Sequence, residues 1–357
     1  MEVSTTELAK LCEKLAEKVL EVEVEDKKVV AMPDFYVDHF IQIPMSFEEF
    51  ARRVKQVYQQ RGGNVAPTRH HLLRGGNAAN TVAALAKLGA RAYLIAETDE
   101  LGFELAEKLL GEVGAHLEHM KVGVKGSYTA ALELETEERR MVNVMISDPG
   151  PVAEFDFSKL SIEDVKLIEE ADLVCVFNWA QNRKGTELAE EVFKLAKRSK
   201  GKTYFDPGDP SLKPSEVKKA REVLLTSGLL DFLSLNENEV RWFEERGEQL
   251  IEKVRLLSEN ALCEVDLHTA HHVYVGRSGA VAEVPTFRVE QRRSTGAGDS
   301  WNAGNIFGIL AGFDFVERMV VANAVAAYYI SHEKGEHPTR RDLARFLEER
   351  AEELTGG

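Results

Sequence analysis

Cysteine is scarce in this chain. Only 3 of its 357 residues are cysteines, and Cys12, Cys175 and Cys263 lie far apart in the sequence. An odd number of distant cysteines without a C-x-x-C pair predicts no disulfide framework, and a chain of this length needs none to bury a sufficient core. Buried thiols in a reducing cytoplasm are therefore the interpretation that fits best.

Long apolar runs and a basic charge balance are also missing. No apolar run reaches the roughly 18 residues that a membrane span needs, and the start, MEVSTTELAK, lacks the pattern of a signal peptide. With 45 basic and 60 acidic residues the formal net charge is −15, which argues against binding to a nucleic-acid backbone. It leaves room for a local cationic pocket for a small anion. We expect a cytoplasmic protein without a membrane or nucleic-acid partner.

The composition is that of a globular protein. Hydrophobic residues make up 44% of the chain and charged residues 29%, which excludes disordered and collagen-like classes. The length suits one large α/β domain, or a domain with a subdomain.

Residues 4–20 predict a helix in front of the main domain. Ser4 and Glu7 have capping-box spacing, and apolar residues then recur on one helical face: Leu8, Leu11, Cys12, Leu15 and Val19. We treat residues 1–27 as an appended helix that packs on the main domain, residues 28–357, or on a partner chain.

Strand and helix patterns alternate along most of the main domain. This alternation predicts an α/β fold, a doubly wound and mainly parallel sheet with helices on both faces. Residues 128–135 and 140–147 show period-two alternation around an acidic turn, which predicts an antiparallel hairpin. We expect a small β lid formed from about 39–60 and 116–148, with a helix over 45–61 and a loop over 62–77.

The strongest chemical signal is the segment Ser294–Asp299, STGAGD, which runs into an apolar helix. Successive amides at a helix N-terminus bind an anion, and a carboxylate beside them suits a base that takes a proton from an attacking hydroxyl. The alternative is a tight turn in which Asp299 only caps the helix. Trp301 stands where a dinucleotide fingerprint needs its third glycine, so that fingerprint is excluded.

Two further segments carry polar side chains in useful places. In Arg74–Asn80, RGGNAAN, paired glycines open a helix, leaving Asn77 and Asn80 free to bind a polyol, and Asp38 could clamp two sugar hydroxyls. Asn236 and Glu239 are three residues apart at a helix start, where they could orient waters on Mg²⁺. The alternative for each is a cap or turn residue.

Taken in their order along the chain, the three segments resemble those of the ribokinase-like carbohydrate kinases, the PfkB family. The resemblance covers about residues 28–345 and implies a catalytic base at Asp299 and an anion hole at Gly296, Ala297 and Gly298. It implies sugar contacts from Asp38, Gly76, Asn77, Asn80 and Asn178. It also implies a magnesium motif at Asn236 and Glu239, with nucleotide contacts from Asn236, Thr269 and Asn323.

The sequence departs from the family pattern in two places that matter for the nucleotide. Arg293 and Ser294 replace an Asp-Thr pair, whose aspartate helps many relatives bind a monovalent cation; the hypothesis is that the Arg293 guanidinium replaces that ion. The segment His268–His271 replaces a glycine-containing turn near the nucleotide phosphates. The donor could therefore be ADP rather than ATP.

A basic cluster raises the question of the substrate. A neutral sugar needs only Asp and Asn groups, whereas a phosphorylated sugar needs Arg, Lys or His donors, for which the main candidates are His71, Arg74 and Arg140. Solvated surface is the alternative for each. The resemblance to archaeal relatives favours an ADP-dependent ribose-1-phosphate kinase.

Two other functions stay open. A nucleoside kinase would need an apolar slot for a base, which Phe35, Tyr36, Phe177 and Trp179 could supply. A non-catalytic ligand sensor would not need Asp299. The expected partners are a small sugar or sugar phosphate and a nucleotide, and either the appended helix or the lid could form a homodimer.

Overall fold

The structure, a computed structural model, describes residues 3–135, 141–293, 295–332 and 335–355. In these ranges the main sheet has eight strands in the order β14-β13-β12-β11-β10-β9-β1-β4. Neighbouring strands from β4 to β12 run parallel, and β13 and β14 are antiparallel additions at one edge. The bounds are β1 Lys28–Met32, β4 Arg91–Leu94, β9 Leu173–Val176, β10 Lys202–Phe205, β11 Phe232–Asn236, β12 Glu264–His268, β13 His272–Arg277 and β14 Ala280–Pro285.

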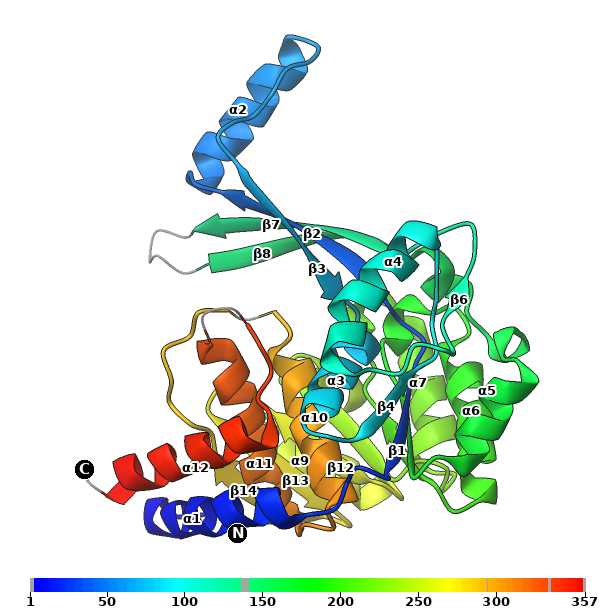
Figure 1. Cartoon of the computed structure of the whole chain (residues 1–357), viewed down its shortest axis with the longest axis vertical. Coiled ribbons are helices and arrows are strands. Elements are labelled where there is room, and N and C mark those ends of the chain that lie inside the picture. Colours follow the sequence, from blue (N-terminus) through cyan, green and yellow to red (C-terminus); the bar gives the residue numbers. More distant parts are fainter. Residues whose placement is uncertain (1–2, 136–140, 294, 333–334, 356–357) are drawn as a thin grey trace.

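Helices cover both faces of this sheet (Figure 1). One apolar core includes residues of α1 Thr5–Glu21, α3 Asn77–Lys87, α10 Ala297–Leu310, α11 Phe315–Ser331 and α12 Arg340–Thr355. The other includes residues of α5 Ile162–Glu170, α6 Gly185–Arg198, α7 Val217–Ala220, α8 Glu239–Phe243 and α9 Leu250–Asn260. The predicted doubly wound α/β fold is confirmed. Within the described ranges no helix is long and apolar enough to span a bilayer.

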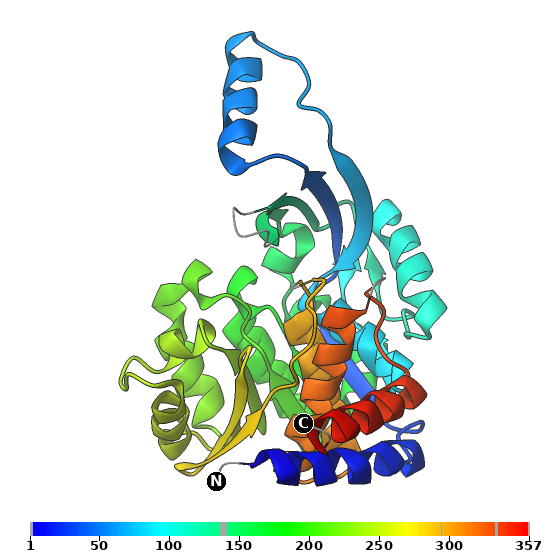
Figure 2. The same cartoon turned by 90° about the vertical axis from the view of Figure 1, so that its left-hand side faces the viewer.

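A second, smaller sheet forms the lid. Its strands follow the order β3-β2-β7-β8, with bounds β2 Tyr36–Ile43, β3 Arg69–Gly75, β7 Tyr128–Glu135 and β8 Met141–Asp148. A helix, α2 Phe47–Gln59, joins β2 to β3 and points away from the body (Figures 1 and 2). The remaining α-helix is α4 Glu100–Leu109, and the remaining strands are the short pair β5 Glu97–Thr98 and β6 Lys121–Val122.

The loop expected over 62–77 is wrong for Arg69–Gly75, which is strand β3. The segment lacks a clean hydrophobic alternation, and most of its residues are exposed. Its strand conformation comes from the long antiparallel pairing with β2, from Tyr36 opposite Gly75 to Gln42 opposite Arg69. Tertiary pairing therefore overrides the local pattern.

Buried polar contacts fix α10 against the sheet. Asn302 donates to Asp206 (2.7 Å) and accepts from the Tyr204 hydroxyl (2.8 Å). One turn later Asn305 donates to Asp266 (2.7 Å) and accepts from Arg318 of α11 (2.8 Å). Buried polar groups with satisfied partners favour one arrangement over others, so the first turn of α10 is held at a fixed place above the sheet.

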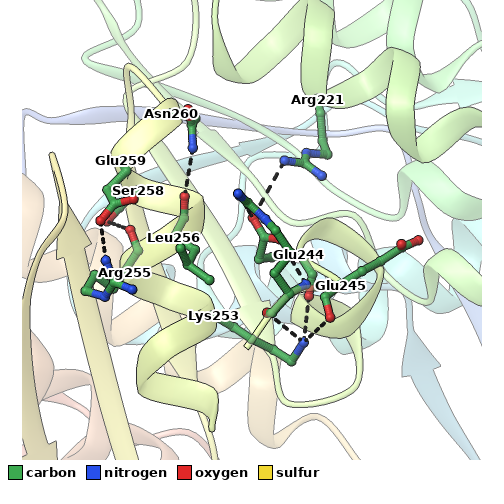
Figure 3. A network of polar contacts seen from close by, with 10 residues as sticks. Arg221, Glu244, Glu245, Lys253, Arg255, Leu256, Ser258, Glu259 and Asn260 are labelled. Carbon is green, nitrogen blue, oxygen red and sulfur yellow. Dashed lines mark hydrogen bonds and ion pairs between the residues drawn. The ribbon is translucent and has the colours of Figure 1, made fainter. Parts of the chain in front are cut away.

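A lysine closes the connection between α8 and α9 in a similar way (Figure 3). Lys253 is buried, and its ammonium group donates to the carbonyl oxygens of Glu244 (2.8 Å) and Glu245 (3.2 Å). Glu244 in turn pairs with Arg246 (2.8 Å). The contacts satisfy backbone carbonyls where α8 ends.

The N-terminal helix packs on the main domain. Its capping box at Ser4 and Glu7 is present, and Leu15 and Val19 are fully buried against the core shared with α12. Lys14 and Lys18 both donate to Glu317 of α11 (2.8 and 2.6 Å). The appended helix therefore packs on the main domain of its own chain.

Shortening a buried side chain of α1 should therefore destabilise the whole protein. We expect Leu15→Ala to lower the free energy of unfolding by about 2–5 kcal/mol, because it leaves a cavity. Leu20→Ala is the matched control, because Leu20 is half exposed, and it should cost less than about 1 kcal/mol. Denaturant titration measures both, and equal small losses would show that α1 does not belong to the core.

Candidate active site

The first turn of α10 forms an open cradle of amides. Gly296 precedes the helix with a φ of 83°, and a Cβ there would lie 2.8 Å from the Tyr329 hydroxyl. A Cβ on Gly298 would lie 3.3 Å from the His268 ring. The first helical hydrogen bond runs from the Ser300 N–H to the Gly296 carbonyl (3.0 Å), so the N–H groups of the preceding turn point beyond the helix end. Gly296, Ala297 and Gly298 thus belong to this open turn, and their role as an anion hole stays a prediction.

Asp299 follows this cradle and is 8% exposed. Its Oδ2 accepts a hydrogen bond from the side-chain amide of Asn80 on α3 (2.9 Å). Burial raises the pKa of Asp299 well above its usual value, the Asn80 bond lowers it, and the charges of Asp206 and Asp34 raise it further. A carboxylate with a raised pKa is a stronger base than an exposed one, which suits proton abstraction from a hydroxyl.

Asp34 organises the other side of the site, although no motif singled it out. It is fully buried and accepts from the backbone N–H groups of Asn77 (2.8 Å) and Ala78 (2.9 Å). It therefore caps α3, whose N-cap residue Gly76 has no side chain to do so. Its third partner is the side-chain amide of Asn178 (3.0 Å), which links Asn178 to the start of α3. An acid directly after strand β1 is the signal that could have revealed it.

Asp38 lies within β2 and is buried. Burial raises the pKa of Asp38 to about 6, with a smaller lowering from Thr129 and a raising contribution from Asp34. A Cβ on Gly75 would lie only 2.2 Å from the Asp38 carboxylate. Glycine is therefore needed where β3 meets α3, because the Asp38 carboxylate occupies that space.

A cavity of about 520 Å³ opens between the lid and these helix ends. Its lining brings together predicted site residues from distant parts of the chain: Asp38, His71, Arg74, Asn80 and Gly296. The predicted Arg140 lies outside the described residues. Lys87, Tyr329 and His337 also line the cavity, and sequence reasoning missed them because they belong to no recognised motif.

Arg74 is a partly buried positive charge in the lining of this cavity. Its Nε atom is enclosed, and its guanidinium has no hydrogen-bond or ion-pair partner among the described residues. Burial lowers the pKa of Arg74, and the nearby Tyr329 and Asp299 oppose that shift. A partly buried cation without a partner is costly unless an anion joins it.

His337 and Tyr329 form the wall beside the cradle. Their rings stack at 4.6 Å, and Nδ1 of His337 lies 3.3 Å from the Ser300 hydroxyl. Burial, followed by the charges of Arg74 and Lys87, holds the pKa of His337 well below its usual value. The imidazole is therefore neutral at physiological pH and adds no positive charge to the cavity.

Asn236 and Glu239 lie together at the start of α8. Asn236 accepts from the Glu239 N–H (3.1 Å) and donates to its carboxylate (2.5 Å), so it acts as a turn residue ahead of α8, whose N-cap is Asn238. Glu239 is buried, and its pKa is raised well above normal by burial and then by Asp206. No group of three or more metal-ligating side chains gathers within the described ranges. A buried carboxylate beside further acids nevertheless fits Mg²⁺ held through waters.

Thr269 and Asn323 are engaged within the chain. The Thr269 hydroxyl donates to the carbonyl of His272 (2.7 Å) and shapes the turn between β12 and β13. Asn323 accepts from the Trp301 indole (3.0 Å) and donates to the carbonyl of Pro285 (3.1 Å). Their contacts with a nucleotide stay predictions.

Several solved structures are similar in fold to this chain. A ribokinase from Arabidopsis thaliana complexed with ribose and ATP has a TM-score of 0.69 and 18% identity, covering 90% of this chain and 98% of its own. An adenosine kinase from Sinorhizobium meliloti has a TM-score of 0.70 and 20% identity, covering 89% and 98%. A fructokinase from Xylella fastidiosa with bound ATP has a TM-score of 0.70 and 16% identity, covering 90% and 99%. At these identities the likeness shows the fold alone.

No curated protein matches the sequence significantly. The pfkB family carbohydrate kinase profile, however, matches residues 46–341, which include both glycine motifs, the cradle and Asp299. The chain therefore belongs to the pfkB family of carbohydrate kinases and is a phosphotransferase.

Proposed function

We propose that this kinase phosphorylates a sugar that already carries a phosphate, with ribose 1-phosphate as acceptor, ribose 1,5-bisphosphate as product and ADP as donor. The observation that carries the proposal is Arg74, a partly buried guanidinium without a partner among the described residues, in the same cavity as Asp38 and Asn80. A neutral sugar offers this cation only hydroxyl oxygens as acceptors, whereas a phosphate also supplies an opposite charge and can pair with it in a bidentate way.

The cavity has separate groups for the two ends of such a substrate. Asp38 and Asn80 offer oxygen and amide groups to sugar hydroxyls, and the same lining holds positive charges at Arg74 and Lys87. His71 lies in the same lining on β3. Binding energy at a phosphate remote from the reacting hydroxyl then serves to orient that hydroxyl.

The chemical step follows from the first turn of α10. Asp299 takes the proton of the sugar 5-hydroxyl as its O–H bond breaks and a new O–P bond forms. The bond between the transferred phosphoryl group and the donor breaks, which leaves AMP when ADP is the donor. The amides of Gly296, Ala297 and Gly298 hold the phosphoryl oxygens as their charge is redistributed. When bound near Asn236 and Glu239, Mg²⁺ would supply charge neutralisation at the phosphates.

Fewer observations support ADP as the phosphoryl donor than support a phosphorylated acceptor. His268 lies against Gly298, beside the cradle, where relatives carry a glycine-containing turn. A ribokinase from Cryptococcus neoformans is described in complex with ADP, but the Arabidopsis ribokinase carries ATP. A coupled assay that crosses ADP and ATP with ribose, ribose 1-phosphate and nucleosides distinguishes the donors.

The four aromatic residues suggested as a base-binding site for a nucleoside kinase do not form one in this cavity. Phe35, Phe177 and Trp179 are fully buried, and Tyr36, which is 3% exposed, donates to Gln181 (2.6 Å). None of the four lines the cavity. A cytoplasmic location remains our proposal, supported by three cysteines that are all buried and unpaired.

Removing the base should slow turnover strongly without unfolding the protein. We expect Asp299→Asn to lower kcat by about two to four orders of magnitude, the usual reach of general-base catalysis. Wild-type kcat/KM should fall as the pH decreases, because the pKa of Asp299 is raised and Asp38, with a pKa of about 6, takes up a proton as well. A thermal unfolding curve checks the fold, and near-full activity of the variant contradicts the assignment.

The phosphate of the substrate should depend on Arg74. We expect Arg74→Gln to raise KM for ribose 1-phosphate about 10- to 100-fold, because a charge-assisted contact is lost, and to change KM for ribose little. Arg69→Gln is the matched control, because Arg69 lies on the same strand but is exposed. Equal effects of Arg74→Gln on both substrates would show that Arg74 does not contact the phosphate.

Arg293 should make the enzyme independent of potassium. A Cβ on Gly335 would overlap the Arg293 guanidinium, whose Nη2 lies 3.5 Å from the carbonyl of His332. Arg293 lines the same cavity as Gly296, so its positive charge belongs to the site. We expect the same activity in potassium and in choline salts, and a loss of at least tenfold in Arg293→Ala at unchanged ionic strength. A strict potassium requirement of the wild type would contradict this role.

A further inference from the structure

Two backbone carbonyl groups of the cradle are held by side-chain hydroxyls. The Ser300 hydroxyl donates to the Gly296 carbonyl (2.8 Å), which also accepts from the Ser300 N–H (3.0 Å). A serine within a helix often bonds the carbonyl four residues earlier. Here the preceding carbonyl, that of Thr295, is held as well, by the hydroxyl of Tyr329 on α11 (3.2 Å).

The direction of these two carbonyls sets the direction of two cradle amides. A peptide unit is planar and trans, so its C=O and N–H groups point in opposite directions. The Thr295 carbonyl shares its peptide unit with the Gly296 N–H, and the Gly296 carbonyl shares its unit with the Ala297 N–H. Because the carbonyls point toward Tyr329 and Ser300, the two N–H groups point away from these side chains.

His337 contacts both side chains that hold the carbonyls. Its ring stacks on that of Tyr329, with the centroids 4.6 Å apart and the planes inclined by 14°. Its Nδ1 lies 3.3 Å from the hydroxyl oxygen of Ser300. Ser300 is fully buried and His337 is 5% exposed, so water does not compete for the contact between them.

The protons of this group have one consistent arrangement. The single hydroxyl hydrogen of Ser300 is used in the bond to Gly296, so toward His337 the Ser300 oxygen can only accept. Nδ1 of His337 must then carry a hydrogen and donate it to Ser300. Burial, followed by the charges of Arg74 and Lys87, holds the pKa of His337 well below its usual value, so Nε2 carries no proton.

A chain of hydrogen bonds therefore runs in one direction, from His337 through Ser300 to the Gly296 carbonyl. Bonds in such a chain polarise and strengthen one another. Tyr329 acts beside this chain on the Thr295 carbonyl. All three side chains can thus affect the cradle amides through carbonyl groups, without touching the transferred phosphoryl group.

We propose that His337, Ser300 and Tyr329 are positioning residues that keep the Gly296 and Ala297 N–H groups aimed as an anion hole requires. This role rests on the anion hole proposed above. Amides that are already aimed at the place where charge is redistributed need little reorganisation during phosphoryl transfer. The three residues would serve the reaction in this way whichever sugar and nucleotide the enzyme uses.

Nitrate is a suitable probe of the cradle, because it is a planar anion with one charge, like the PO₃ unit of a loose transition state. We expect nitrate to inhibit the wild type in the presence of the sugar and the dephosphorylated nucleotide. Tyr329→Phe and Ser300→Ala each remove one hydroxyl. Each should lower kcat and the affinity for nitrate about 10-fold or more, and change KM for the sugar less than about twofold.

The nitrate measurement separates positioning from loss of folded protein. A partly unfolded preparation has a lower apparent kcat, but its folded fraction keeps the inhibition constant of the wild type. Tyr328→Phe is the matched control, because it removes the same group from the next residue of α11, whose ring stacks on His332. It should leave kcat and nitrate inhibition unchanged.

A double-mutant cycle tests whether His337 acts through Ser300. His337→Phe keeps a ring beside Tyr329 but removes the Nδ1 donor, and it should lower kcat in the wild-type background. In the Ser300→Ala background, which lacks the hydroxyl, it should cause no further loss. Equal losses in both backgrounds would overturn the relay through Ser300. Circular dichroism shows whether each variant is folded.

The remaining outcomes distinguish this role from the proposed function. Near-full activity of Asp299→Asn would contradict the proposed base, and the nitrate data would still decide on the positioning residues. A wild type that nitrate does not inhibit would overturn the anion hole and the positioning role together. Unchanged nitrate inhibition in both Tyr329→Phe and Ser300→Ala, beside an inhibited wild type, would overturn the positioning role alone.

Discussion

The hydrogen bond between Asn80 and Asp299 joins the two halves of the site. It links the first turn of α3 to the first turn of α10, across 219 residues of sequence. Because both turns are rich in glycine and alanine, the two helix ends approach closely enough for this contact. The anion cradle, the base and the sugar-binding side chains keep their relative positions only while this junction holds.

Two kinds of rigidity support that junction. From below, Asn302 and Asn305 fix α10 to the sheet through fully buried hydrogen bonds. From the side, α10 lies so close to α11 that a Cβ on Gly304 would be 2.7 Å from the Ala322 Cα. Groups that are held before substrate arrives need little reorganisation during the reaction, which is how fixed dipoles lower a barrier.

The acidic residues of the site give the positive charge of Arg74 a role. Burial and mutual repulsion raise the pKa values of Asp38 and Asp206 to about 6, and that of Asp299 is raised as well. A phosphorylated substrate entering beside these acids would be repelled without Arg74. Under the function proposed above, the hydroxyl end of the substrate faces the acids and its phosphate end faces the guanidinium.

The sequence predicted those parts of the site that local chemistry determines. The doubly wound fold followed from alternating strand and helix patterns. The sequence also placed Gly296 and Asp299 at a helix start, where the structure has them, while their catalytic roles stay predictions. Strand β3, the capping role of Asp34 and the stack of Tyr329 on His337 were not predicted. Each depends on a contact between distant segments, and no local periodicity encodes such a contact.

The three thiols have a consequence for handling the protein. Cys12, Cys175 and Cys263 are buried, and burial raises the pKa of Cys12 and of Cys263 to about 12. Alkylating reagents attack the thiolate, so the folded protein should resist them and tolerate air without cross-linking. Any labelling that does occur would report transient opening of the interior, and the rate at each cysteine would measure how often its region of the core opens.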